Sequence, residues 1–407
     1  MITKEFITRL PKNDLHLHLD GSMRLGTLIE LGEQYGVELP ATTEEGLKQT
    51  VFKERYDSLA DYLRGFKYTG KVLQSELALS RVSYELAEDC QAEGCRYIEV
   101  RFAPQLHMHR HLSCENVLKA VNEGLRKAQA EFNLRPEIRD GKEPPFEYGI
   151  IVCAMRMFLP SFSEYYSDLW RVHSHSEPEM LYAMASLELA RAVVRVRDEA
   201  GIPIVGFDLA GEEAGFPAGV HKEAFAYCHK HFMKKTVHAG EAYGPESIFQ
   251  AVTELYADRL GHAYYLYDQD TVKDPEITDR EAYTRALVEF IADRRVTLEI
   301  CLTSNLQTIP KLRDLKEHNF AKMMKDRQST TFCTDNRTVS NTTVTSEILK
   351  AVEHLGLGVR DLRNSVIYGF KRSFFPHSYS RKRAYVRQII DYYDQVEAEF
   401  GIERKNS

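Results

Sequence analysis

Eight short apolar segments recur along the chain, and segments with helical periodicity lie between them. The predicted strands are residues 13–19, 96–102, 148–155, 203–209, 235–239, 258–262, 296–301 and 330–334. Strands that alternate with helices pair in parallel, because each helix returns the chain to the same edge of the sheet. Eight such units in 407 residues predict an α/β fold, the (β/α)8 barrel of the TIM type.

Three segments depart from this repeat. Residues 24–93 follow the first predicted strand, and their length predicts extra helices before the second strand. Residues 133–147 contain several prolines and charges, which indicates a surface loop. Residues 379–400 have the periodicity of a C-terminal helix. Because no linker or low-complexity stretch divides the chain, we expect residues 1–407 to form one domain.

Charge and composition limit the classes of partner. A net charge of −7 gives no reason to expect binding to nucleic acid or to an anionic membrane surface. No apolar run approaches the roughly 20 residues that span a bilayer, and the first residues, MITKEFITRLPKND, lack the apolar core of a secretory signal. Seven cysteines without a regular spacing suggest free thiols in a reducing compartment. We therefore expect a cytoplasmic protein with small-molecule partners.

The first predicted strand carries two histidines on one face. In NDLHLHLDGS, His16 and His18 alternate with leucines, so both imidazoles point to the same side of the sheet. Such a pair is more often incidental than a pair of metal ligands, and the rest of the chain has to decide. The other strand ends supply further polar side chains, namely His238, Glu241, His262, Asp335 and Asn336.

Catalytic groups of a (β/α)8 barrel stand at the carboxyl ends of its strands, so these side chains are expected to meet. Three imidazoles and one carboxylate form a suitable set of ligands for Zn²⁺ or Fe²⁺, with one position left for water. A further imidazole and a glutamate then remain for acid–base chemistry. The sequence therefore predicts a metal site at this end of the barrel.

The segments HLHLDGS, FDLAGEE, VHAGE, RLGH, CLTSNLQT and TDN, in this order between about residues 10 and 375, resemble the adenosine deaminase family. The resemblance implies a zinc hydrolase with one metal ion per chain on a (β/α)8 barrel. Such an enzyme removes the 6-amino group of a purine as ammonia, and its substrates here would be water and adenosine, with 2′-deoxyadenosine as a second nucleoside. The product from adenosine is inosine.

The resemblance also implies roles for individual positions. The implied metal ligands are His16, His18, His238 and Asp335. Glu241 matches the residue that gives a proton to purine N1, and His262 matches the imidazole that orients the attacking hydroxide. The implied substrate contacts are Gly211, whose backbone N–H meets purine N3, Asp20 near the ribose 5′-hydroxyl, and Ser304.

The implied chemistry explains these residue types. Aromatic C6 is a poor electrophile, and protonation of N1 makes it a better one. That proton must come from a carboxylic acid that is neutral near pH 7, so we expect burial to raise the pKa of Glu241. Zinc lowers the pKa of bound water towards about 7 and so provides hydroxide for attack on C6.

The segment SLADYLRGF bears on the choice of substrate. Leu59, Tyr62 and Phe66 are spaced i, i+3 and i+7, which predicts one apolar face of a helix. Such a stripe usually packs on the body of the protein. Here it also matches the wall that covers the sugar in nucleoside-specific relatives, so we expect the three side chains to bind substrate. Tyr62 stands where an aromatic residue without a hydroxyl is commoner in the family.

Asn336 departs from the family pattern, which usually reads TDD where this chain reads TDN. The second acidic residue of the family hydrogen-bonds purine N7, an acceptor, and a carboxyl group donates there only when protonated. An asparagine amide donates without any change of protonation. We therefore expect Asn336 to donate to N7, and TDN resembles a bacterial branch of the family.

Other functions fit parts of this pattern. Within the family, the substrate could instead be adenine, an N6-modified AMP or an aminodeoxyfutalosine-type nucleoside. A phosphorylated substrate requires a cluster of basic residues, and the candidates Arg101, Arg156 and Arg337 are scattered along the sequence. Metal phosphoesterases also begin with H-x-H, yet they bind two or three metals, and FDLAGEE lacks the lysine of many binuclear amidohydrolases. A purine-binding barrel without catalysis would not need the complete set of chemical groups.

Overall fold

The computed structural model describes residues 2–402. Within this range, eight strands form one sheet in which each strand pairs in parallel with the next along the chain. The strands are β1 (Lys12–His18), β2 (Cys95–Phe102), β3 (Glu147–Met155), β4 (Ile204–Ala210), β5 (Lys234–Ala239), β6 (Arg259–His262), β7 (Thr297–Ile300) and β8 (Ser329–Phe332). Each strand lies within two residues of its predicted range at either end, so the strand predictions are confirmed.

The sheet closes into a barrel where the chain leaves β8 and returns to β1. Just beyond β8, Asp335 pairs in parallel with Leu17. The Asp335 N–H donates to the His16 carbonyl, and the His18 N–H donates to the Asp335 carbonyl, both at 2.8 Å. The predicted (β/α)8 barrel is therefore confirmed, and its closing seam lies among the predicted site residues.

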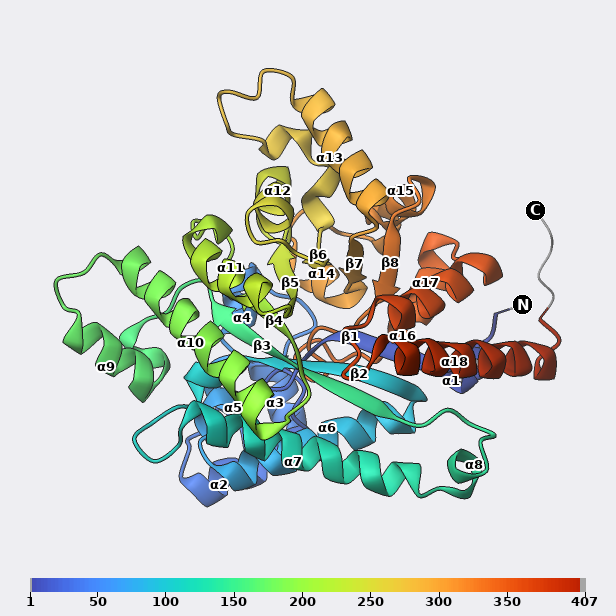
Figure 1. Ribbon diagram of the computed structural model, residues 1–407, viewed down its shortest axis with the longest axis horizontal. Coiled ribbons are helices and arrows are strands. Elements are labelled where there is room, and N and C mark those ends of the chain that lie inside the picture. The colour runs from blue at the N-terminus through green and yellow to red at the C-terminus, as the bar shows by residue number, and fades with distance from the viewer. Residues whose placement is uncertain (1, 403–407) are drawn as a thin grey trace.

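Helices surround the barrel, with one or more after each strand (Figure 1). Those that follow β2 are α7 (Cys114–Asn133), α8 (Pro136–Arg139), α9 (Glu164–Val172), α10 (Pro178–Ala200), α11 (Lys222–Lys230), α12 (Pro245–Thr253), α13 (Arg280–Arg294), α14 (Leu302–Thr308), α15 (Phe320–Lys325), α16 (Val344–Leu355), α17 (Val359–Arg372) and α18 (Tyr379–Glu399). The predicted C-terminal helix is α18, which lies beside α1 (Lys4–Arg9). The predicted loop over residues 133–147 contains only the single turn of α8.

The long segment after β1 holds the predicted extra helices. They are α2 (Leu25–Tyr35), α3 (Glu44–Thr50), α4 (Leu59–Leu63), α5 (Phe66–Val72) and α6 (Glu76–Ala92). The prediction that Leu59, Tyr62 and Phe66 share one helix is wrong, because α4 ends before Gly65 and α5 begins after it. Glycine has a poor helix propensity, which favours the break. The rings of Tyr62 and Phe66 still lie 6.3 Å apart across it.

Apolar and polar side chains separate to the two sides of the barrel wall. Leu15 and Leu17 of β1 belong to the large hydrophobic core under the helices. Arg259 of β6 contacts Glu99 of β2 and donates to Glu299 of β7 at 2.7 Å, and contacts between such distant strands place these charges inside the barrel. Side chains alternate along a strand, so the histidines of β1 turn towards this polar interior.

Two expectations from composition can be compared with the structure. All seven cysteines are free thiols. Among residues 2–402, no helix combines the length and the apolar character that crossing a membrane requires.

Candidate active site

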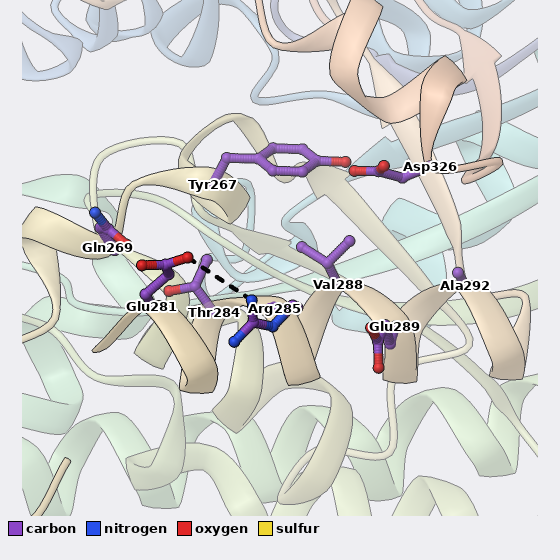
Figure 2. A pocket seen from close by; sticks show the side chains of 9 residues that line it. All are labelled: Tyr267, Gln269, Glu281, Thr284, Arg285, Val288, Glu289, Ala292 and Asp326. Atoms are coloured by element: carbon purple, nitrogen blue, oxygen red, sulfur yellow. Dashed lines mark ion pairs between the residues drawn. The ribbon is translucent and has the colours of Figure 1, made fainter. Parts of the chain in front are cut away.

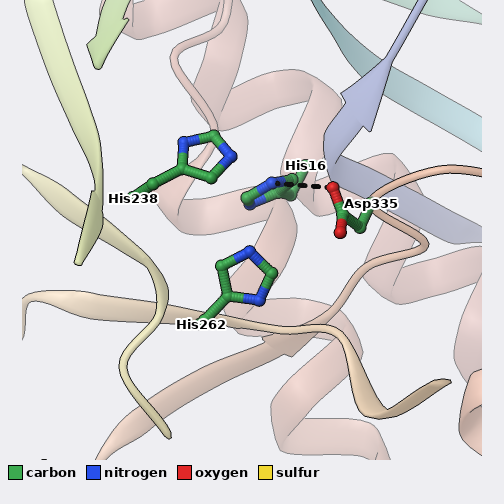
Figure 3. A group of neighbouring side chains, drawn as sticks. All are labelled: His16, His238, His262 and Asp335. Atoms are coloured by element: carbon green, nitrogen blue, oxygen red, sulfur yellow. Dashed lines mark ion pairs between the residues drawn. The ribbon is translucent and has the colours of Figure 1, made fainter. Parts of the chain in front are cut away.

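The predicted metal ligands meet at the carboxyl ends of the strands. His16 and His18 lie at the end of β1, His238 lies in β5, His262 ends β6, and Asp335 follows β8. The ligand atoms of His16, His238, His262 and Asp335 all lie within 4.8 Å of one another, and the four side chains are buried (Figure 3).

His18 joins this group through two short contacts. Its Nε2 lies 3.1 Å from Nε2 of His238 and 3.4 Å from Oδ1 of Asp335. The Nε2 atom of His16 lies 3.4 Å from the same oxygen. Ligand atoms around a tetrahedral zinc ion, with bonds of about 2.0–2.1 Å, are separated by about 3.4 Å. The three separations are close to this value, so they are compatible with His16, His18, His238 and Asp335 as ligands of one ion, whereas the group within 4.8 Å contains His262 in place of His18.

In His16 and His238, the ring nitrogen Nδ1 faces a carboxylate. Nδ1 of His16 lies 2.8 Å from Oε2 of Glu299, and Nδ1 of His238 lies 3.2 Å from Oδ1 of Asp208. An ionised carboxylate can only accept a hydrogen bond, so Nδ1–H of each ring is the donor. In the tautomer that carries its single proton on Nδ1, the ring turns an unprotonated Nε2 towards the centre of the site. This is the form in which an imidazole binds a metal ion.

One buried arginine joins the two carboxylates. Arg101 donates from Nη1 to Asp208 and from Nη2 to Glu299, both at 2.9 Å. Arg101, Asp208 and Glu299 are fully buried. The guanidinium therefore fixes the two groups that orient His16 and His238, and it offsets part of their negative charge.

The surroundings of His262 are different. Its Nδ1 faces the side-chain amide nitrogen of Asn305 at 3.1 Å, not a carboxylate. Its Nε2 lies 3.6 Å from Oε1 of Glu241. Burial lowers the pKa of His262 well below its usual value, so the ring is neutral.

Glu241 is held where its carboxyl group stays protonated. It is buried, and burial, followed by the charges of Asp335 and Glu213, raises its pKa well above the usual value. The loop that carries Glu241 is anchored by the Glu213 carboxylate, which accepts hydrogen bonds of 2.6–3.0 Å from the backbone N–H groups of residues 240–243. A neutral carboxylic acid is thus presented beside His262.

Ser304 lies beside Asp335. It is fully buried, and its hydroxyl donates to Oδ2 of Asp335 at 2.7 Å. The hydroxyl is therefore already engaged with the carboxylate that closes the metal group. Ser304 thereby orients Asp335, and its expected contact with the substrate stays a prediction.

Asn336 and Tyr62 are joined directly. The Asn336 amide donates to the Tyr62 hydroxyl at 2.8 Å, and that hydroxyl also lies 2.8 Å from Oγ of Ser340. A Cβ atom added to Gly21 would lie 1.7 Å from Oδ1 of Asn336, so only glycine fits there. The carbonyl oxygen of the amide is thereby packed against the main chain, and its N–H groups point away from Gly21.

The remaining predicted substrate residues lie on the segments that follow β1 and β4. Asp20 is buried with Oδ1 lacking a hydrogen-bond partner among the described residues, and burial raises its pKa to about 6. Gly211 directly follows β4 with φ +100°, a backbone conformation that favours glycine. Leu59 and Tyr62 are buried, and Phe66 is half-buried.

Several supporting residues were not predicted from the sequence. Glu299 and Arg101 are charged residues inside otherwise apolar strands, and Asp208 and Glu213 lie in the segment FDLAGEE. A charge inside a buried strand signals a partner, because an unpaired buried charge is costly. The signal does not say which strand across the barrel supplies the partner.

The three scattered arginines do not form a basic cluster. Arg101 bridges Asp208 and Glu299. Arg156 donates to two main-chain carbonyls, those of Phe216 and His238, and Arg337 contacts the Glu93 carboxylate. Each of these guanidinium groups is already paired within the fold.

A cavity of about 440 Å³ lies at another place in the molecule (Figure 2). It is lined by residues of α13 and its neighbours, among them Tyr267, Asp326 and the ion pair of Arg285 with Glu281. None of the nine lining residues is a predicted site residue.

The sequence is similar to proteins of known family. The model of the family described as "Adenosine deaminase" matches residues 11–175 and 177–392. An adenosine deaminase from Mycolicibacterium vanbaalenii is 36% identical over 393 residues, which are 96% of this chain and 96% of that protein.

Solved structures share the fold at lower identity. An amidohydrolase from Burkholderia ambifaria with bound Zn superimposes with a TM-score of 0.75 at 18% identity, covering 99% of this chain and 96% of that one. The N6-methyl-AMP deaminase from Arabidopsis thaliana gives a TM-score of 0.71 at 22% identity, covering 98% of this chain and 100% of that one.

Proposed function

The chain belongs to the adenosine deaminase family, and from this we propose that it hydrolyses adenosine, and 2′-deoxyadenosine, at C6 of the purine, with release of ammonia. The single observation that carries the proposal is the placement of the buried Glu241 carboxyl group, whose pKa burial raises, 3.6 Å from His262 and beside the buried group of three histidines and Asp335. The chain is accordingly a hydrolytic deaminase.

We propose that one zinc ion per chain is held by His16, His18, His238 and Asp335. The separations of 3.1–3.4 Å between their nitrogen and oxygen atoms support this set. When bound, zinc supplies a Lewis acid that lowers the pKa of water to about 7. Glu299 and Asp208 keep His16 and His238 in the tautomer that such an ion needs.

Glu241 is proposed to give its proton to purine N1. Its raised pKa keeps the proton in place at neutral pH until a ring nitrogen takes it. Protonation of N1 draws electron density from C6 and so favours attack by water. The Nε2 atom of His262 faces the same carboxyl group, and we assign it to the orientation of the attacking water.

The proposed purine and sugar contacts come from three segments of the chain. The backbone N–H of Gly211 is assigned to N3, and the second N–H of the Asn336 amide is assigned to N7. Asp20 has a buried oxygen without a partner among the described residues, which suits a ribose hydroxyl. Leu59, Tyr62 and Phe66 are proposed to cover the sugar and exclude water.

A nucleoside is favoured over a nucleotide. A phosphate group needs cationic or N–H donors that are free to bind it, and the three arginines considered for this role are paired within the fold. We therefore place AMP and its N6-modified forms after adenosine as substrates. Adenine lacks the sugar that the proposed wall would cover, so it ranks lower as well.

A small substrate panel tests the proposal. Ammonia release should be measured on the zinc-loaded chain with adenosine, 2′-deoxyadenosine, adenine and AMP. We expect adenosine to exceed adenine in kcat/KM by at least about 10²-fold, which corresponds to about 2.7 kcal/mol of transition-state binding. If AMP or adenine were the best substrate, the proposed nucleoside preference would be wrong, and no ammonia from any of the four would overturn the proposed activity.

A further inference from the structure

We propose that His318, acting through Asn305, fixes the tautomer of His262 with its proton on Nε2. His318 and Asn305 would then be positioning residues, since neither is assigned to substrate or metal. The inference rests on the proposed function for the role of His262, but the tautomer itself is a property of the fold. It follows from a chain of three hydrogen bonds in which each donor is determined by the one before.

The series of hydrogen bonds begins at a backbone N–H group. Phe320 N–H donates to Nδ1 of His318 at 3.0 Å. A peptide nitrogen can only donate, so Nδ1 of His318 carries no proton. His318 is buried, and burial lowers its pKa to about 3, so the ring is neutral at physiological pH. Its single proton is therefore on Nε2.

That proton determines the orientation of an amide. Nε2 of His318 lies 3.2 Å from the side-chain oxygen of Asn305, which accepts the hydrogen bond. The opposite orientation would set an amide N–H against Nε2–H of His318, with no acceptor between them. The NH₂ group of Asn305 must therefore face the other way, towards His262.

The amide in turn determines the tautomer of His262. Its nitrogen lies 3.1 Å from Nδ1 of His262, and an amide NH₂ group only donates. Nδ1 of His262 is thus the acceptor. The proton of the neutral ring is on Nε2, the atom that lies 3.6 Å from Oε1 of Glu241.

The ring nitrogen that carries the proton in His262 is the opposite one from that in His16 and His238. Nδ1 of His16 and Nδ1 of His238 face carboxylates, so their Nε2 atoms carry lone pairs for a metal ion. His262 is close enough to belong to the same group of ligand atoms, all within 4.8 Å. A protonated Nε2 cannot bind a metal, so Asn305 and His318 keep this imidazole out of the ligand set and available as a donor.

Asn305→Asp is the sharpest test, because asparagine and aspartate have the same shape, but the asparagine amide donates hydrogen bonds and an ionised aspartate only accepts them. An ionised aspartate accepts from both histidines, which moves the His262 proton to Nδ1. In the zinc-loaded full-length chain labelled with ¹⁵N-histidine, we expect His262 to show an unprotonated Nδ1 and a protonated Nε2. A spectrum of the His262→Gln variant identifies the two signals. In Asn305→Asp the two signals should exchange character.

Turnover gives a second measurement. A histidine held in the wrong tautomer typically lowers kcat by about 10²- to 10⁴-fold. We expect a loss in this range for Asn305→Asp, with KM for adenosine changed by less than about threefold. A merely structural defect would reduce the amount of folded enzyme and leave the His262 tautomer unaltered.

Two replacements of His318 separate its hydrogen bond from its bulk. Glutamine presents an amide N–H where His318 has Nε2–H, so His318→Gln should keep the tautomer and retain kcat within about threefold. His318→Leu fills the space but frees the Asn305 amide to turn, so its His262 signals should broaden or mix and its kcat should fall. Another fully buried histidine, His107, supplies the control, and His107→Leu should leave the tautomer of His262 unchanged.

The inference and the proposed function fail in different ways. A parent protein whose His262 carries its proton on Nδ1 would overturn the inference, whatever the enzyme does. Equal kcat values for His318→Gln and His318→Leu would also overturn it. A parent with the expected tautomer that releases no ammonia from any purine would instead overturn the proposed function and leave the hydrogen-bond chain in place.

Discussion

The side-chain amide of Asn336 donates a hydrogen bond to the hydroxyl of Tyr62 at 2.8 Å. At both positions the resemblance to the family implies a different residue as the commoner one. From the sequence they are two separate changes, because Asn336 is predicted to contact the purine and Tyr62 is predicted to cover the sugar. In the folded protein they form one unit, because the tyrosine hydroxyl supplies an acceptor for one of the two amide N–H groups.

Removal of that hydroxyl should weaken substrate recognition. In Tyr62→Phe the amide loses its partner and its orientation, and a neutral hydrogen bond contributes about 0.5–1.5 kcal/mol. We expect kcat/KM for adenosine to fall by about 2- to 12-fold. Tyr56 packs edge-on against Tyr62 and donates elsewhere, so Tyr56→Phe is the matched control and should change kcat/KM less. Equal losses in the two variants would contradict the coupling.

The contact between Asn336 and purine N7 can be tested with an altered substrate. In 7-deazaadenosine a carbon replaces N7, and the unpaired buried donor should cost roughly 1–3 kcal/mol, or about 5- to 150-fold in kcat/KM. Asn336→Ala should lose a similar factor on adenosine and almost nothing further on 7-deazaadenosine. The two changes are then non-additive. If the parent and Asn336→Ala lose the same factor on 7-deazaadenosine, Asn336 does not contact N7.

The proposed metal set predicts the effect of His238→Ala. Loss of one imidazole ligand should remove most of the bound zinc and nearly all deaminase activity, because the remaining ligands no longer surround the ion. Elemental analysis of the purified chain gives the zinc content. The same substitution at His229, an exposed histidine of α11, should leave zinc at one ion per chain. Full zinc content in His238→Ala would remove His238 from the proposed ligands.

Glu241→Gln separates binding from proton transfer. Glutamine keeps the shape of the side chain but cannot deliver a proton to N1, and general acid catalysis typically contributes about 10²- to 10⁴-fold. We expect kcat to fall by this factor, with zinc content and the binding of inosine retained. Glu246→Gln, at a half-buried position in the first turn of α12, is the matched control and should keep kcat. Turnover of Glu241→Gln within about threefold of the parent would exclude Glu241 as the acid.

Arg101→Met should affect both folding and metal affinity. The variant leaves the Asp208 and Glu299 carboxylates buried without their shared cation, and breaking a buried ion pair costs about 3–5 kcal/mol in the free energy of unfolding. Because both carboxylates orient histidines, zinc affinity should fall by about 10- to 100-fold. Denaturant unfolding and zinc titration measure the two effects. Arg64→Met removes an exposed pair with Asp61 and should change the free energy of unfolding by less than about 0.5 kcal/mol.

The barrel could be predicted from the sequence because its strands and helices have clear periods. Each strand of the barrel is a short apolar run, and each ends close to the residue at which its pattern ends. The break between α4 and α5 was not predicted, because Leu59 and Phe66 keep helical spacing on either side of Gly65. The spacing of apolar residues indicates which side chains could share one face of a helix. A short break in the helix does not change that spacing, so the sequence pattern does not reveal the break.

The predicted site residues come together because they lie at strand ends, which a barrel gathers at one opening. Their partners were harder to predict. His318 lies 56 positions from His262 along the sequence, and no local pattern indicates that an amide of α14 connects them. The proposed division of the four histidines into metal ligands and a proton-bearing ring depends on which nitrogen donates and which accepts. Contacts between distant elements decide this, and only the folded chain provides them.

The seam between β1 and β8 has a consequence for the order of events during synthesis. His16 is made before Asp335, which follows it by 319 positions along the sequence, and the two residues meet through the hydrogen bonds that close the barrel. While β8 of a nascent chain is still inside the ribosome, the chain therefore carries the histidines of the proposed site without Asp335 beside them. If these residues hold the proposed ion, it should bind only after the barrel has closed, and the bound ion would then link the first and the last strand of the sheet and stabilise the closed barrel.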